Sequence, residues 1–195
     1  CRIRIKNKLI NVTGKAWMDQ QWSDSEYAKD RWYWFSVQLD NGTEMVCCMY
    51  DDGEVKTYFA DISNADGTQE HFRKPEIVPL GQHWKSPKSS AVYPMSWNIR
   101  LPAKHTDIVL TARVRNQEML FGSINYWEGP MLVSGSFEGK KVNGVGFMEL
   151  VGYPSRYSNV KYIRDEIGKT AGRFASIVRN KAFDLSGNLK RRIVG

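Results

Sequence analysis

The chain has 195 residues, 42% of them hydrophobic and 12% aromatic, which is long enough for one domain with a substantial core. Its net charge of +7 lies after residue 155, where ten Lys or Arg face three acids, so residues 1–155 are neutral. A neutral body argues against a nucleic-acid-binding surface. The three cysteines, Cys1, Cys47 and Cys48, do not predict a set of disulfides, because adjacent cysteines rarely pair with each other.

The first 155 residues alternate apolar and polar side chains in the way typical of β-strands. Strands are predicted near 9–22, 31–40, 43–50, 54–62, 69–78, 92–101, 107–115, 124–137 and 141–153. Turn signals lie between or beside them, at Asn41-Gly42, Asp52-Gly53, Asp66-Gly67, Glu138-Gly139 and Asn143-Gly144. Short strands joined by hairpins predict an all-β, up-and-down antiparallel β-barrel over residues 1–155, of a size that encloses one ligand. A β-sandwich fits the same pattern.

The sequence period changes after Tyr153-Pro154. Ser158 is expected to cap an amphipathic helix that runs to about Phe183, with basic residues around its apolar stripe. Residues 156–195 are therefore predicted to be a basic C-terminal helix and tail. Such a helix either packs on the barrel wall or makes peripheral contact with a membrane surface or a partner.

Three acids stand beside aromatic residues. In a strand over 14–22, Asp19 shares a face with Trp17, while Gln20 lies opposite with Trp22. Glu149 shares a face with Val145, Phe147 and Tyr153, and Glu128 follows Trp127. A carboxylate in such a setting must be hydrogen-bonded or protonated, since burying a bare charge is costly. The acids either fix the barrel structurally or mark a pocket for a large apolar ligand.

Two chemistries fit such a pocket. A carboxyl group with a raised pKa can protonate an alkene, which makes Asp19 and Glu149 candidate general acids. Alternatively, the pocket orients a flexible polyene, and Gln20 with Trp and Tyr donors polarises a carbonyl. His71, His83 and His105 lack metal-ligand spacing, and no cofactor fingerprint is present. Cys47 and Cys48 are interpreted as core residues.

Five motifs occur together, from Gly14 to Tyr153: GKAWMDQQW, WFSVQLDNGTEM, HWKSPKSSAVYPMSWNIRLP, NYWEGPMLVSG and GVGFMELVGY. In their order and spacing they resemble the carboxyl-terminal lipocalin-like domain of the carotenoid 1,2-hydratase/AttH-like family, which includes hydratases and fungal lipocalin-like Diels–Alderases. The resemblance implies two lipocalin-like barrels packed together, with no metal or organic cofactor. It also implies a large, apolar small-molecule substrate held in or between the barrels.

The family elements are matched residue by residue. The Trp-x-Asp-His element matches Trp17, Asp19 and Gln20, with glutamine where histidine is usual. The residue pattern and the resemblance together give a candidate site, in which Asp19 and Glu149 are the expected catalytic residues. Its ligand-binding residues are Trp17, Gln20, Trp22, Trp34, Tyr93, Trp97, Trp127, Glu128 and Tyr153. No metal ligand is predicted.

The expected function is that of a cofactor-free enzyme acting on a large apolar natural product or isoprenoid, by Diels–Alder-type cyclisation, isomerisation or hydration. A non-catalytic carrier of a hydrophobic ligand is the alternative, because barrels of this type host many functions. Family members usually carry an amino-terminal barrel as well. A second lipocalin-like domain, on the same or another chain, is therefore an expected partner.

Overall fold

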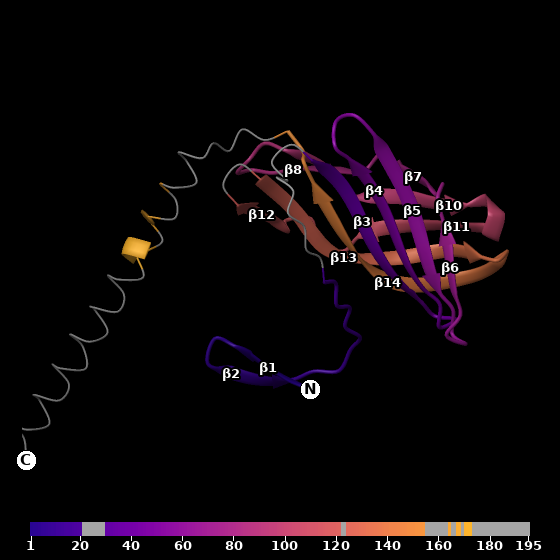
Figure 1. The fold of residues 1–195 in the computed structure, drawn as a ribbon. Helices are drawn as coiled ribbons and strands as arrows, with labels where there is room; N and C mark the ends of the chain where they lie inside the picture. The colour runs from indigo at the N-terminus through magenta and orange to yellow at the C-terminus, as the bar shows by residue number, and fades with distance from the viewer. Residues whose placement is uncertain (21–29, 122–123, 155–163, 165–166, 169, 173–195) are drawn as a thin grey trace, which may run out of the picture.

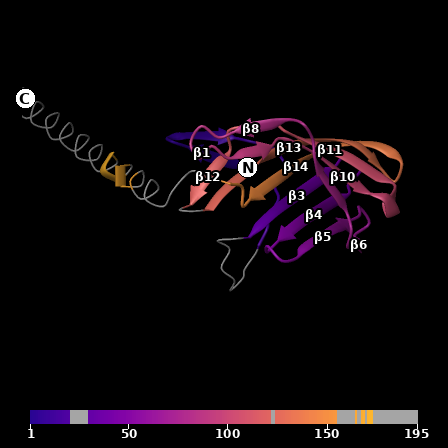
Figure 2. The same cartoon turned by 90° about the horizontal axis from the view of Figure 1, so that it is seen from above.

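The computed structural model describes residues 1–20, 30–121, 124–154, 164, 167–168 and 170–172. One antiparallel sheet, curled into a half-barrel, dominates it (Figures 1 and 2). Its strands are β3 (Arg31–Leu39), β4 (Glu44–Asp51), β5 (Lys56–Ser63), β6 (Gln69–Phe72), β7 (Glu76–Pro79), β10 (Ser96–Leu101), β11 (Thr106–Ala112), β12 (Glu118–Phe121), β13 (Ile124–Phe137) and β14 (Lys140–Val151). The remaining elements are the hairpins β1 (Arg2–Ile5) with β2 (Lys8–Asn11) and β8 (His83–Lys85) with β9 (Val92–Pro94), and a 3-10 helix, η2 (Pro102–Lys104).

The sheet is a meander whose first and last long strands pair. The strand order is β6-β5-β4-β3-β14-β13-β11-β10-β7, and β12 adds a tenth strand on β13. The all-β antiparallel prediction is confirmed, but the predicted closed barrel is wrong, because the described sheet is open between β6 and β7. Both edge strands have only four residues, β7 ends in Pro79, and Glu70 occupies β6. Short strands, proline and charge all disfavour edge pairing.

Four of the predicted turns are confirmed. Gly42, Gly53, Gly67 and Gly139 have positive φ angles of 85°, 94°, 85° and 73°, and each lies between two paired strands. The turn predicted at Asn143-Gly144 is wrong, because both residues lie inside β14. A Cβ atom on Gly144 would lie 2.4 Å from the carbonyl oxygen of Gln38. Glycine is needed there because β14 approaches β3 closely.

The concave inner face of the sheet holds the core. The alternating residues Phe35, Val37 and Leu39 of β3 are buried, as are Met95, Trp97, Ile99 and Leu101. Met131, Val133, Met148 and Leu150 complete this layer from β13 and β14. Side chains therefore fill the half-barrel interior, so the ligand space expected inside the barrel has to be sought on another surface.

The two ends of the chain differ from expectation. The strand predicted over 9–22 is limited to β2, and residues 12–20 have no regular secondary structure. Of the predicted C-terminal helix, only Arg164, 167–168 and 170–172 are described, so this helix and the division at residue 155 stay predictions. Within the described residues, no helix is long and apolar enough to cross a membrane.

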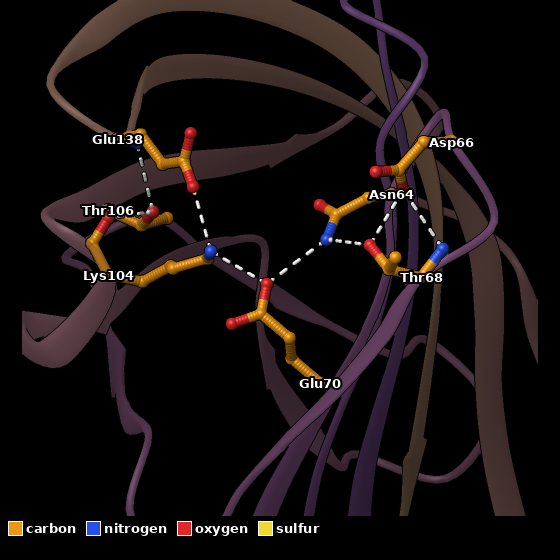
Figure 3. A network of polar contacts seen from close by, with 7 residues as sticks. All are labelled: Asn64, Asp66, Thr68, Glu70, Lys104, Thr106 and Glu138. Atoms are coloured by element: carbon orange, nitrogen blue, oxygen red, sulfur yellow. Dashed lines mark hydrogen bonds and ion pairs between the residues drawn. The ribbon is translucent and has the colours of Figure 1, made fainter.

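A polar network connects the edge strand β6 with η2 and with the turn between β13 and β14 (Figure 3). The Lys104 ammonium on η2 lies 2.6 Å from the Glu70 carboxylate on β6 and 2.7 Å from that of Glu138 in the β13–β14 turn. The Asn64 side chain donates to Glu70 as well, at 3.0 Å. The hydrogen bond from Lys104 is the main cause that lowers the pKa of Glu70, followed by that from Asn64.

We expect Lys104→Met to lower the melting temperature at neutral pH, because Glu70 and Glu138 both lose their cationic partner. The lowered pKa of Glu70 means that its stabilising contribution is present above the ordinary glutamate value of 4.5 and is lost as pH falls through the folded value. The difference in melting temperature should therefore shrink in acid. Thermal unfolding from pH 3 to pH 8 checks this, with the exposed Lys85→Met on β8 as control. A pH-independent difference would contradict the ion-pair explanation.

Candidate functional site

The outer face of β3, β14 and β13 brings together the acids singled out in the sequence. Val145, Phe147 and Glu149 project outward from β14 because Met148 and Leu150, which alternate with them, enter the core. Cross-strand pairing places Glu128 opposite Glu149, and Trp34 opposite Glu149 on its other side. We call this line of three residues, the acids Glu149 and Glu128 together with the neighbouring Trp34, the acid row. It lies outside the half-barrel, and not in the interior, where an enclosed pocket was expected.

Tryptophan indoles hold the carboxylates. Trp32 Nε1 donates to Glu149 Oε1 at 2.6 Å, and Trp17 Nε1 donates to Asp19 Oδ1 at 2.7 Å. Trp32 is buried, and its ring packs edge-on against Tyr126 at a centroid distance of 5.8 Å. A donor held rigidly by packing fixes the orientation of the Glu149 carboxyl group.

The acids perturb one another. Desolvation by burial is the main cause that raises the pKa of Glu149, and the negative charges of Glu128 and Asp19 raise it further, against the opposing hydrogen bond from Trp32. Burial first, and then the charge of Asp19, raises the pKa of Glu128. Glu149 therefore keeps its proton to higher pH than an ordinary glutamate, which is the property of a general acid.

A groove runs along the outer face beside the acid row. Its volume is about 520 Å³. The floor comes from β3, β14 and β13, and the N-terminal segment contributes Lys15 and Trp17. Its lining residues are Lys15, Trp17, Ser36, Gln38, Leu39, Asp40, Arg113, Pro130, Gly144, Val145, Gly146 and Phe147. This volume falls within the range of small-molecule sites.

Other predicted ligand-binding residues lie on the inner face. Trp97 and Trp127 are fully buried, and their indole N–H groups donate to the carbonyl oxygens of Pro94 and Arg115. Tyr93 donates to Glu118 at 2.8 Å, and its ring lies 4.9 Å from that of Tyr153. Tyr153 was expected on the face of Glu149, but Gly152, with a φ of 80°, breaks the alternation and turns it inward.

The remaining predicted residues fall elsewhere. Gln20 is exposed at the end of the described N-terminal segment, and Trp22 lies outside the described residues. The thiols of Cys47 and Cys48 are buried, and desolvation raises the pKa of each to about 12. Cys47 is confirmed as a core residue, whereas Cys48 is buried on the other face of β4, opposite Trp34.

Sequence reasoning missed three residues of this surface. Trp32 is two residues before Trp34, so strand alternation alone places both on one face and could have found it. Lys15 and Arg113 are far apart in the sequence, and only the fold brings them to one groove. No local signal marks either of them.

Comparison with known proteins places this fold in a family. Residues 1–153 match the model of the AttH-like family. The chain is 24% identical over 154 residues to kievitone hydratase of Fusarium solani subsp. phaseoli, and 23% identical over 147 residues to dehydratase asqC of Emericella nidulans. These alignments cover 74% and 70% of this chain, but only 41% and 42% of the relatives.

Two solved structures are similar as well. The crystal structure of kievitone hydratase from Nectria haematococca matches with a TM-score of 0.56 and 24% identity, over 63% of this chain and 39% of that one. An AttH protein from Nitrosomonas europaea matches with a TM-score of 0.53 and 28% identity, over 64% of this chain and 39% of that one. The chain thus spans about two fifths of the length of these relatives.

Proposed function

Because the chain belongs to the AttH-like family, we propose that its acid row and groove form one wall of the active site of a hydratase or dehydratase. The substrate is a large apolar natural product. The observation that carries the proposal is that the exposed Asp19 lies near the partly desolvated Glu128 and Glu149, beside the groove. The names of the two distant relatives, a hydratase and a dehydratase, support this reaction class.

In the hydration direction, Glu149 donates its proton to one carbon of a substrate alkene. Water adds to the neighbouring carbon and gives up a proton to the Asp19 carboxylate, whose orientation is held by Trp17. Proton exchange with solvent then restores both groups. Dehydration is the reverse: the protonated Asp19 donates its proton to the leaving hydroxyl group, and the Glu149 carboxylate removes a proton from the adjacent carbon. The Trp32 N–H stabilises the Glu149 carboxylate, which forms during hydration and acts as the base in dehydration.

We propose that a second lipocalin-like domain packs against the outer face of β13 and β14. Leu132, Val145 and Phe147 are 52%, 41% and 40% exposed on adjacent strands, although they are large and apolar. Contiguous apolar surface of this kind marks a binding interface. A domain packed over it would exclude water from the acid row and complete an apolar pocket, on the same chain or on another.

Cofactor-free cyclisation is a second candidate, supported by Gln20 where the resembled family element has histidine. A glutamine amide hydrogen-bonds a carbonyl group but does not transfer protons near neutral pH. The groove would then act by orienting a polyene for a Diels–Alder reaction or an isomerisation. A non-catalytic carrier would use the same groove and release its ligand unchanged.

Isotope labelling distinguishes these functions. The purified chain is incubated with kievitone, and separately with polyene probes, in H2¹⁸O, and the products are analysed by mass spectrometry. Hydration is expected to add one labelled water, whereas cyclisation leaves the mass unchanged and alters the absorption spectrum. Recovery of unchanged ligand after saturable binding would identify a carrier and contradict the proposed enzyme.

A further inference from the structure

Two basic side chains line the groove from separate segments of the chain. Lys15 belongs to the N-terminal segment, and Arg113 follows β11. Both are exposed, and neither forms an ion pair within the described residues. Asp40 also lines the groove, but its Oδ2 accepts the backbone N–H of Asn143 at 3.1 Å, which turns this carboxylate towards the β14 backbone. The groove therefore has two cations available for an anionic ligand group.

Arg113 is separated from the acid row by an apolar stretch. The backbone N–H of Arg113 donates to the carbonyl oxygen of Pro130 at 3.0 Å, and Pro130 lies opposite Phe147. Phe147 is two residues before Glu149 on the same face of β14. A strand rises about 3.3 Å per residue. The backbone of Arg113 therefore contacts the sheet about 7 Å from Glu149, measured along β14. A ligand spanning this distance has an anionic end, an apolar middle and a reacting end.

We propose that the groove binds an apolar molecule that carries one carboxylate group, with the carboxylate between Lys15 and Arg113. This inference rests on the proposed function and narrows its substrate class from any apolar natural product to an amphipathic acid. The carboxylate fixes the direction in which the molecule enters, because its other end is then the one that reaches Glu149. A neutral hydrocarbon would lie in the same groove without a preferred direction.

A matched pair of fluorescent probes tests this. cis-Parinaric acid and its methyl ester share one polyene body and differ in charge, and their fluorescence reports binding without any turnover. Wild type is expected to bind the acid more tightly than the ester. Arg113→Gln and Lys15→Gln should each weaken binding of the acid about fivefold, the size of an exposed ion pair, and leave binding of the ester unchanged. Added salt should weaken binding of the acid alone.

Arg73→Gln is the control, because Arg73 is also exposed but lies outside the groove. The inference is overturned if acid and ester bind equally, if Arg113→Gln changes neither, or if Arg73→Gln has the same effect as Arg113→Gln. It is also overturned if neither probe shows saturable binding. These outcomes are independent of the proposed reaction, which is tested by incorporation of ¹⁸O. If the protein binds the acid more tightly than the ester but adds no water to a substrate, the proposed function is contradicted and the carboxylate site is retained.

Discussion

Replacement of Glu149 by glutamine is expected to lower turnover by about 10²- to 10⁴-fold, the usual contribution of a general acid, while ligand affinity changes little. Glutamine keeps an oxygen that accepts the Trp32 indole N–H, so the local structure is retained. Only the transferable proton is lost. Product formation by mass spectrometry and probe binding by fluorescence, measured on one preparation, separate the two effects.

The same substitution should not lower stability at neutral pH. The raised pKa of Glu149 means that the folded state keeps this proton to higher pH than the unfolded state, so the group destabilises the fold progressively above the ordinary value of 4.5. Glu149→Gln removes that effect. Its unfolding free energy is therefore expected to match wild type in acid and to equal or exceed it at pH 8. A large loss of stability, together with loss of turnover, would indicate a structural role instead.

Glu128→Gln offers a companion variant with a different readout. The charge of Glu128 contributes to the raised pKa of Glu149, so its removal is expected to lower that pKa. Since Glu149 acts in its protonated form, the alkaline limb of the rate profile should move to lower pH. Unchanged pH dependence in this variant would separate Glu128 from the reaction and leave it as a neighbour of the site.

Replacement of Trp97 by alanine is expected to destabilise the protein by about 3–5 kcal/mol, the typical cost of removing a large aromatic side chain from a core. Trp97 is fully buried, and its ring lies 4.7 Å from Tyr33 and 5.3 Å from Phe35. Its removal leaves a cavity at the centre of the inner face. Urea unfolding measures the difference in unfolding free energy, provided that the dependence of this free energy on urea concentration has the same slope in the variant and in wild type.

Trp17→Ala is the matched control for Trp97→Ala. Trp17 lines the outer groove and is only partly buried, so its loss should cost less than about 1 kcal/mol of stability and should weaken binding of an apolar probe. Both tryptophans were predicted from the sequence to bind ligand. The opposite outcome, with Trp97→Ala stable and Trp17→Ala unfolded, would contradict the division between core and groove.

Local sequence features predicted much of the β-structure. Apolar residues in alternation located β3, β10 and β14, and turn residues with positive φ located four hairpins. The turn predicted at Asn143-Gly144 was wrong because an Asn-Gly pair is also compatible with a close strand approach. The strand predicted over 9–22 is confirmed for residues 9–11 only, because residues 12–20 pair with no neighbouring strand in the described structure; residues 21–22 lie outside it.

The sequence by itself determined that this protein is an antiparallel β-structure with acids set beside tryptophans, because strand period, turn chemistry and composition are local properties. Only the tertiary structure decided which face of each strand became the core. Both faces of β3 and β14 carry large apolar side chains. Alternation therefore shows which residues share a face, but not which of the two faces is buried. Packing placed Trp97 and Trp127 inside and Glu149 outside. It also brought Lys15 and Arg113 to one groove from distant segments, and Asp19 near Glu149. Such a meeting depends on how the whole sheet curls, and no short stretch of sequence encodes that curvature.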